Sequence, residues 1–180
     1  MNIIILYDRL KNIVLRMYRK YVFKHKINCT HSQFSLVENV TLINSNITLG
    51  KNVTIYPNVM FFGDGNIDIG NNVVIGNGTI IYASKLGGVT IRDNTIIAAQ
   101  CYIIDCDHGM NRNKLIRDQI NEVSPITIEE DCWIATQCSI LKGTLIKKGA
   151  VIGANSLVKG EIPEYGVVIG TPGKIIKYRI

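Results

Sequence analysis

The sequence repeats an aliphatic residue at every sixth position from about residue 31 onward, most clearly over 49–60, 69–80, 91–102 and 128–157. A small or β-branched residue follows each aliphatic anchor four positions later. These slots hold Val53, Val59, Val73, Thr79, Thr95, Cys101, Cys132, Cys138, Thr144, Ala150 and Ser156. A helix repeats every 3.6 residues and a strand every two. A period of six with Gly or Asn between the anchors therefore predicts short strands separated by regular turns.

Three such strands close a triangular coil of about 18 residues. The phase of the repeat predicts six coils, at 31–48, 49–66, 69–86, 91–108, 128–145 and 146–163. Parallel strands stack about 4.8 Å apart, so six coils would form a prism on the order of 30 Å long. The expected fold class is an all-β solenoid, a parallel β-helix of about six coils.

Extra residues interrupt the period of six at three places: two residues near 67–68, four at 87–90 and nineteen at 109–127. The last break predicts a long loop after coil four, directly following Asp105-Cys106-Asp107-His108. Long loops inside regular domains commonly carry function. We therefore expect the functional site near residue 108.

The net charge of +6 comes entirely from the start of the chain. Residues 1–26 hold seven basic residues and one acid, whereas the rest holds 13 of each. Because the body of the protein is neutral, no nucleic-acid partner is expected.

The same basic segment has three- and four-residue apolar spacing, which predicts an amphipathic helix over residues 2–24. The apolar positions are Ile3, Leu6, Leu10, Ile13, Val14, Met17 and Tyr21. Two roles remain open for this helix. It could cap the exposed edge of coil one, or its apolar face could lie in an anionic membrane interface. The continuous apolar run from Ile3 to Leu6 is too short for a signal peptide or a membrane span.

Five cysteines, at positions 29, 101, 106, 132 and 138, show no C-x-x-C spacing. An odd count without metal or redox spacing favours reduced thiols in the cytoplasm. Three of them occupy the small-residue slot of the repeat, where a thiol acts as a small apolar filler.

Each repeat begins with an aliphatic residue, often followed by Gly, and has a small residue four positions after the aliphatic one. This six-residue pattern resembles the repeat of the hexapeptide-repeat acyltransferases over about residues 31–175. The ending GANSLVKGEIPEYGVVIGTPGKIIKYR is similar to the closing stretch of that family. The resemblance implies a left-handed coil, although most parallel crossovers are right-handed. It divides the chain into a basic helix (1–27), a catalytic β-helix (28–165, with loop 109–127) and a closing segment (166–180). The resemblance is closest to bacterial sugar and polysaccharide O-acetyltransferases.

His108 is the expected catalytic base, because the D-C-D-H run resembles the active-site histidine of those enzymes. An imidazole within reach of an acceptor hydroxyl can take its proton, and Asp105 or Asp107 would orient the ring. Counting coils predicts Lys142 beside Asp105 and Lys85 beside Asp107, so that one acid would be held in an ion pair. Cys106 is a disfavoured alternative as nucleophile, since the family transfers the acyl group directly.

The resemblance also places acetyl-CoA along the later coils, between two subunits of a trimer, with no metal. The expected cofactor-binding residues are Trp133, Ala135, Thr136, Ala154, Lys159, Lys174 and Arg179. Lys159 stands one position away from the lysine of the family's usual Thr-Lys pair, which puts its phosphate contact in doubt. The acceptor sugar is expected to meet Tyr82, Lys85 and Trp133.

Packing three prisms side by side would create three equivalent clefts, so a C3 homotrimer is expected. Competing activities are N-acetylation of an amino-sugar nucleotide, serine-type O-acetylation and transfer of a longer acyl group. A β-helical zinc carbonic anhydrase would need three histidines at one interface, but His25 and His31 lie outside the late coils. A structural solenoid is the non-enzymatic alternative. The expected location is cytoplasmic, with peripheral membrane contact through residues 2–24.

Overall fold

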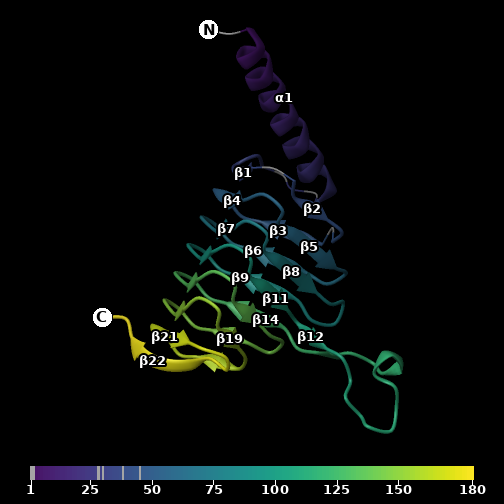
Figure 1. Ribbon diagram of the computed structural model, residues 1–180, viewed down its shortest axis with the longest axis vertical. Coiled ribbons are helices and arrows are strands. Elements are labelled where there is room, and N and C mark those ends of the chain that lie inside the picture. Colours follow the sequence, from purple (N-terminus) through teal and green to yellow (C-terminus); the bar gives the residue numbers. More distant parts are fainter. Residues whose placement is uncertain (1–2, 28, 30, 38, 45) are drawn as a thin grey trace.

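The computed structural model describes residues 3–27, 29, 31–37, 39–44 and 46–180. Helix α1 (Ile3–Lys26) is followed by a three-sided prism of short strands, from which one loop projects (Figure 1). The predicted helix is confirmed and continues to Lys26; Asn2, where the prediction began, lies outside the described residues.

Each side of the prism is one sheet. Face A contains β1 (Phe34–Leu36), β4 (Val53–Ile55), β7 (Val74–Ile75), β10 (Ile96–Ile97), β15 (Trp133–Ile134), β18 (Val151–Ile152), β21 (Gly166–Ile169) and β22 (Lys174–Tyr178). Face B contains β2 (Thr41–Leu42), β5 (Met60–Gly63), β8 (Ile80–Ala83), β11 (Tyr102–Ile104), β16 (Ser139–Ile140) and β19 (Leu157–Val158). Face C contains β3 (Ile47–Leu49), β6 (Ile67–Ile69), β9 (Val89–Ile91), β14 (Ile126–Ile128), β17 (Leu145–Ile146) and β20 (Glu161–Ile162).

These strands form six complete coils, and β21 begins a seventh, as the period of six predicts. All pairs within the faces are parallel except β21 with β22. The long loop leaves coil four between its second side, β11, and its third side, β14. The repeat count had started a new coil at residue 128, whereas Ile126–Ile128 closes coil four on face C.

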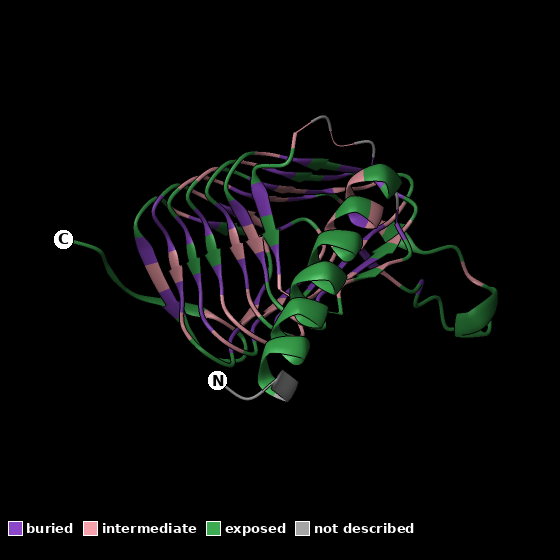
Figure 2. Cartoon of the chain, turned by 90° about the horizontal axis from the view of Figure 1, so that it is seen from above, coloured by how far each residue is buried: buried purple, intermediate pink, exposed green. Residues whose placement is uncertain are grey.

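The interior is a stack of aliphatic side chains. Figure 2 shows the buried positions recurring along the coils. All eleven residues of the small slot are buried, which confirms that the repeat points them inward. The thiols in this slot also donate hydrogen bonds: Cys101 Sγ lies 3.1 Å from the Ala135 carbonyl and Cys138 Sγ lies 3.1 Å from the Gly153 carbonyl. Each of these thiols therefore fills space in the core and also donates a weak hydrogen bond to a carbonyl of the next coil.

The turns between the strands account for the Gly, Asn and other polar residues that separate the aliphatic positions of the repeat. Most turns contain one residue with positive φ, a conformation that Gly adopts freely and Asn tolerates better than branched residues. These positions include Asn52, Asn58, Asn72, Gly78, Asn94, Gln100, Asp131, Gln137, Gly143, Gly149 and Asn155. The amide side chains also stack between coils, since Asn52 donates to Asn72 and Asn72 donates to Asn94.

The two ends of the prism are closed differently. At coil one, Phe23 and Ile27 at the end of α1 are buried, and the Phe23 ring packs against Phe34 and Phe61. At the far end, β22 folds back antiparallel on β21. Only the last turns of α1 therefore act as the expected cap, and most of the helix extends beyond the prism (Figure 1).

Candidate active site

The long loop leaves the prism as a short hairpin. Strands β12 (Cys106–Asp107) and β13 (Glu122–Val123) pair antiparallel, and the Ser124 amide donates to the Asp105 carbonyl at 2.9 Å. The hairpin fixes both ends of the loop at the edge between faces B and C. The segment from 108 to 121, which includes the short helix η1 (Ile116–Asp118), projects from this edge (Figure 1).

Gln119 holds the projecting loop in one shape. Its Oε1 accepts from the Asn111 amide at 2.7 Å, and its Nε2 donates to the carbonyls of Asn111 and Lys114 at 3.0 and 3.1 Å. A Cβ atom on Gly109 would lie 2.9 Å from the Gln119 side chain, so this packing requires glycine. The loop therefore presents an ordered surface beside residue 108.

His108 is exposed at the mouth of this hairpin, directly after Asp107. The other two histidines lie elsewhere. His31 Nε2 is 2.8 Å from the Leu49 carbonyl beside coil one, and His25 stacks on Tyr21 in α1. His108 is thus the histidine that the fold places beside the loop, with its imidazole open to a ligand from solvent.

The Asp105 carboxylate is fully buried and turned away from solvent. It accepts hydrogen bonds from the Ser84 amide (2.8 Å), the Ser84 hydroxyl (2.7 Å) and the Gly88 amide (2.7 Å). A Cβ atom on Gly87 would lie 2.2 Å from Asp105 Oδ2. Asp105 therefore ties coil four, just before His108, to the turn of coil three.

Asp107 lies at the surface in a cluster of charges. Its carboxylate is 3.5 Å from Lys142 Nζ and 3.8 Å from Lys159 Nζ, and Lys142 also pairs with Glu122. The Glu122 and Asp107 carboxylates hold the pKa of Lys142 above its usual value, so its ammonium stays charged at neutral pH. These ion pairs connect both strands of the hairpin to lysines on the next two coils.

These contacts correct two predicted ion pairs. Lys142 pairs with Asp107 instead of Asp105, because the amide and hydroxyl donors of the coil-three turn draw the Asp105 carboxylate inward. Lys85 is exposed and makes no ion pair with the described residues. In this single chain, neither Asp105 nor Asp107 makes a recorded hydrogen bond to His108.

The expected cofactor residues fall into separate groups on one chain. Ala135, Thr136 and Ala154 lie near the edge between faces A and B, where Thr136 Oγ1 donates to the Ala99 carbonyl at 2.7 Å. Trp133 points outward from face A and is 50% exposed. Lys159 lies beside Asp107 at the hairpin.

Arg179 lies at a different edge, where its guanidinium holds the closing segment in place. Its Nη1 donates to Asp131 Oδ2 at 3.1 Å and to the Gly149 carbonyl at 2.9 Å, and the group lies over the Tyr165 ring. Lys174, at the start of β22, is exposed. A single chain therefore does not gather all seven residues into one site.

The acceptor candidates Tyr82 and Lys85 lie on and just after β8, one coil before His108. The Tyr82 ring packs on Phe62 at 5.2 Å, and burial raises the pKa of its phenol. Tyr102 in β11 adds a further outward aromatic ring. No motif in the sequence points to Phe62, Tyr102 or Gln119. The alternation of inward and outward residues in β5 and β11 is the signal that could have indicated the two aromatics.

The described part of the chain contains no group of three His, Cys, Asp or Glu side chains placed to hold a metal ion.

The repeat, the three-sided prism and the interrupted fourth coil define a class of fold: the chain folds as a left-handed parallel β-helix, and its repeats are similar to those of the hexapeptide-repeat family. The family model described as the hexapeptide repeat of succinyl-transferase matches residues 43–83 and 125–159. These segments lie on both sides of the loop that follows His108.

Two curated relatives are similar to this chain over about half of its length. A probable acetyltransferase of Mycobacterium tuberculosis is 41% identical over 92 residues, which is 51% of this chain and 31% of the relative. The putative lipopolysaccharide biosynthesis O-acetyl transferase WbbJ of Escherichia coli is 35% identical over 105 residues, 54% of each chain. The chain thus spans about half, or less, of the length of these relatives.

Among solved structures, the N-acyltransferase AntD from Bacillus cereus, in complex with dTDP and coenzyme A, superposes with a TM-score of 0.74. The match covers 82% of each chain at 19% sequence identity. This similarity establishes a shared fold.

Proposed function

We propose that this protein transfers an acetyl group from acetyl-CoA to a hydroxyl group of a sugar in a bacterial cell-surface polysaccharide or its precursor. The observation that carries the proposal is the position of His108, exposed beside an ordered loop that interrupts an otherwise regular β-helix. The described relatives support acyl transfer as the chemistry, because they are named as acetyl or acyl transferases.

In the proposed reaction, His108 takes the proton of the acceptor hydroxyl as the oxygen attacks the thioester carbonyl. The acyl group moves directly from sulfur to oxygen, and the thiolate of CoA leaves with a proton from the imidazolium. Backbone amides of the rigid coils are candidate donors to the oxyanion. Cys106 is buried, and it takes no part in this scheme.

The surface of the later coils fits an acyl-CoA substrate in two respects. Ala135, Thr136 and Ala154 are small and lie on successive coils, so an extended chain can approach the backbone there. Exposed basic residues, including Lys174 in β22, are available to phosphate groups. Arg179 already binds Asp131 and Gly149, so its proposed contact with CoA would have to compete with those bonds.

We further propose a C3 homotrimer, because two of the three prism faces are apolar outside. Outward positions on face A include Val74, Ile96 and Trp133, and those on face B include Phe62, Tyr82 and Tyr102. Face C is mostly polar, with Thr48, Asp68, Thr90, Thr127 and Glu161 outward and Leu145 as the apolar exception. A cyclic trimer uses two different faces of every subunit.

Packing face A of one copy against face B of the next would bring the neighbouring Trp133 towards Tyr82, Lys85 and His108. The residues that one chain holds apart would then line a cleft between two chains. This arrangement supports the joint assignment of Trp133, Tyr82 and Lys85 to the acceptor. A cytoplasmic location is part of the same proposal, since acetyl-CoA is made and used there.

Transfer to an amine is the second candidate, favoured by the fold shared with AntD, which is named as an N-acyltransferase and was solved with dTDP-4-amino-4,6-dideoxyglucose and coenzyme A. An O-acetyltransferase is preferred here because WbbJ, at 35% identity, is nearer in sequence than AntD at 19%.

The deciding experiment measures CoA thiol release from acetyl-CoA with a panel of bacterial glycans, sugar nucleotides and amino-sugar nucleotides. We expect release that depends on a hydroxyl acceptor and falls by about 10²- to 10⁴-fold in His108→Gln. His25→Gln, a matched change of an exposed histidine on α1, should leave the rate unchanged. Undiminished transfer by His108→Gln would move the base elsewhere, and release only with amine acceptors would establish the second candidate.

A further inference from the structure

Helix α1 carries an exposed row of apolar side chains that the prism does not cover. We call Leu6, Leu10, Ile13, Val14, Met17 and Tyr21 the apolar stripe. Their exposed fractions lie between 42% for Leu6 and 67% for Met17. Since residues three and four apart share one side of a helix, the stripe is a continuous apolar surface about four turns long.

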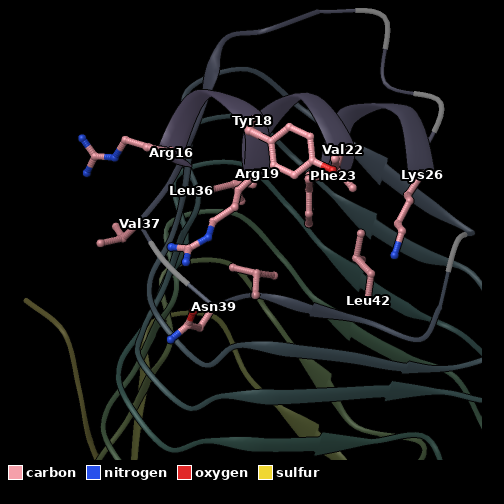
Figure 3. A pocket seen from close by; sticks show the side chains of 11 residues that line it. Arg16, Tyr18, Arg19, Val22, Phe23, Lys26, Leu36, Val37, Asn39 and Leu42 are labelled. Atoms are coloured by element: carbon pink, nitrogen blue, oxygen red, sulfur yellow. The ribbon is translucent and has the colours of Figure 1, made fainter. Parts of the chain in front are cut away.

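The helix contacts coil one by a different side. Arg19, Phe23 and Lys26 point from α1 towards the prism, where they line a hollow of about 210 Å³ with Leu36 and Leu42 (Figure 3). A helix turns by about 100° per residue, so Phe23 lies roughly 130° and Arg19 roughly 170° around the helix from the middle of the stripe. The stripe therefore faces away from coil one, and capping the prism does not explain it.

The helix is also strongly cationic. It carries seven Arg and Lys residues and one acid, Asp8. In the part of the chain that the structure describes, every ion pair lies between Asp107 and Arg179, so no acid is paired with the basic side chains of α1. Lys20 lies over the Phe34 ring and Lys24 donates to Ser32, which leaves the remaining basic side chains that lie away from the prism for an anionic partner. Tyr7 and Tyr18 border the stripe and Tyr21 lies in it, all three exposed, and tyrosine favours the boundary between apolar and aqueous phases.

We propose that α1 docks the protein on an anionic lipid membrane, with the apolar stripe inserted among the acyl chains and the basic side chains that flank it, such as Arg9, Lys11 and Arg16, at the headgroup phosphates. A broad apolar side flanked by basic residues is the pattern of helices that lie in the plane of an interface. No helix among the described residues is long and apolar enough to cross a membrane. This inference does not depend on the proposed function.

A bundle of α1 helices from several copies fits the sequence less well. Continuing the seam of Leu6, Leu10, Ile13 and Met17 by three and four residues leads to Lys20 and Lys24, whose ammonium groups would lie at core positions. Each added copy would also bring six further positive charges together. Charge complementarity therefore favours the lipid surface.

The test is flotation of the full chain with vesicles of phosphatidylcholine alone or of phosphatidylcholine mixed with phosphatidylglycerol. We expect binding to the mixed vesicles that weakens as salt is added, and little binding to phosphatidylcholine. Leu10→Glu/Met17→Glu changes two exposed residues of the stripe and should lower the bound fraction by about tenfold or more. Ile175→Glu/Ile176→Glu places the same charges on exposed positions at the opposite end of the prism and should bind as the unchanged protein does.

Circular dichroism and light scattering accompany each variant, so that a loss of binding can be separated from a loss of fold. Equal flotation of the stripe variant and the control, or no flotation of the unchanged protein, would overturn the proposal. A stripe variant of lower mass, combined with no vesicle binding by the unchanged protein, would assign the stripe to contacts between copies. Transfer to a water-soluble acceptor, which needs no membrane, reports on the proposed function separately.

Discussion

The Asp105 carboxylate accepts hydrogen bonds from two amides and one hydroxyl, although it has no exposed surface. Leaving buried donors without an acceptor is costly, because each has lost its water. Asp105 therefore supports the position of His108 from within the prism, whereas its neighbour Asp107 is partly exposed and paired with lysines.

We expect Asp105→Ala to lower the free energy of unfolding by about 3 kcal/mol or more, since it leaves three donors unpaired. Asp107→Ala should cost less than about 1 kcal/mol, because exposed ion pairs contribute little. Denaturant unfolding followed by circular dichroism measures both. Similar losses for the two variants would mean that the buried bonds of Asp105 contribute no more than a surface pair.

The thiols are expected to react in two classes. Cys101, Cys106, Cys132 and Cys138 are buried, while Cys29 is only half-buried, and burial raises the pKa of Cys132 to about 11. Because a disulfide reagent must reach the sulfur atom, Cys29 should be modified at pH 8 well before the four buried thiols. Thiol counting with and without denaturant tests this; more than one fast thiol in the folded protein would contradict the burial of the other four.

At the scale of elements, the sequence predicted the coils well, because each hexad reports directly which side chain points inward. It predicted where along the sequence the loop begins, directly after His108, for the same reason. It failed for the Asp105 and Asp107 ion pairs, since a coil count gives the level of a residue along the prism but not the side to which its side chain turns. The Asp105 carboxylate turns inward because it accepts hydrogen bonds from Ser84 and Gly88. The break in the repeat at 87–90 places these donors close to it.

The loop after His108 depends on one side chain for its internal bonds. Gln119→Ala removes three hydrogen bonds within the loop and should leave the prism intact. We expect trypsin to cut several-fold faster after Arg112, Lys114 or Arg117, with little change in the free energy of unfolding.

Gln137→Ala is the matched control, because that side chain bonds only to Gln100 on the surface of the coils. Equal cleavage rates in the two variants would show that Gln119 does not order the loop. If acceptor contacts come from this loop, Gln119→Ala should also raise KM for the acceptor more than it lowers kcat.

For the whole molecule, the unequal chemistry of the three faces determines how copies can associate. Face A and face B expose apolar residues and face C exposes polar ones. Burying two adjoining faces on each of three copies leaves the polar faces towards solvent, which is the arrangement expected of a closed ring.

We expect Ile96→Glu, a change on face A at a residue that is 48% exposed, to convert the proposed trimer to monomers while the chain stays folded. Thr48→Glu introduces the same charge on face C and should leave the trimer unchanged. Light scattering coupled to size exclusion gives the mass of each. A monomeric unchanged protein would remove the basis for a cleft shared between chains.

Helix α1 lies against coil one, and His108 lies on coil four. Three coil spacings separate them, a rise of about 14 Å along the prism. The number of coils therefore sets how far along the prism axis His108 lies from α1. Inserting or deleting one whole coil between them would change that separation by about 4.8 Å, so coil number tunes the distance between the helix and the site.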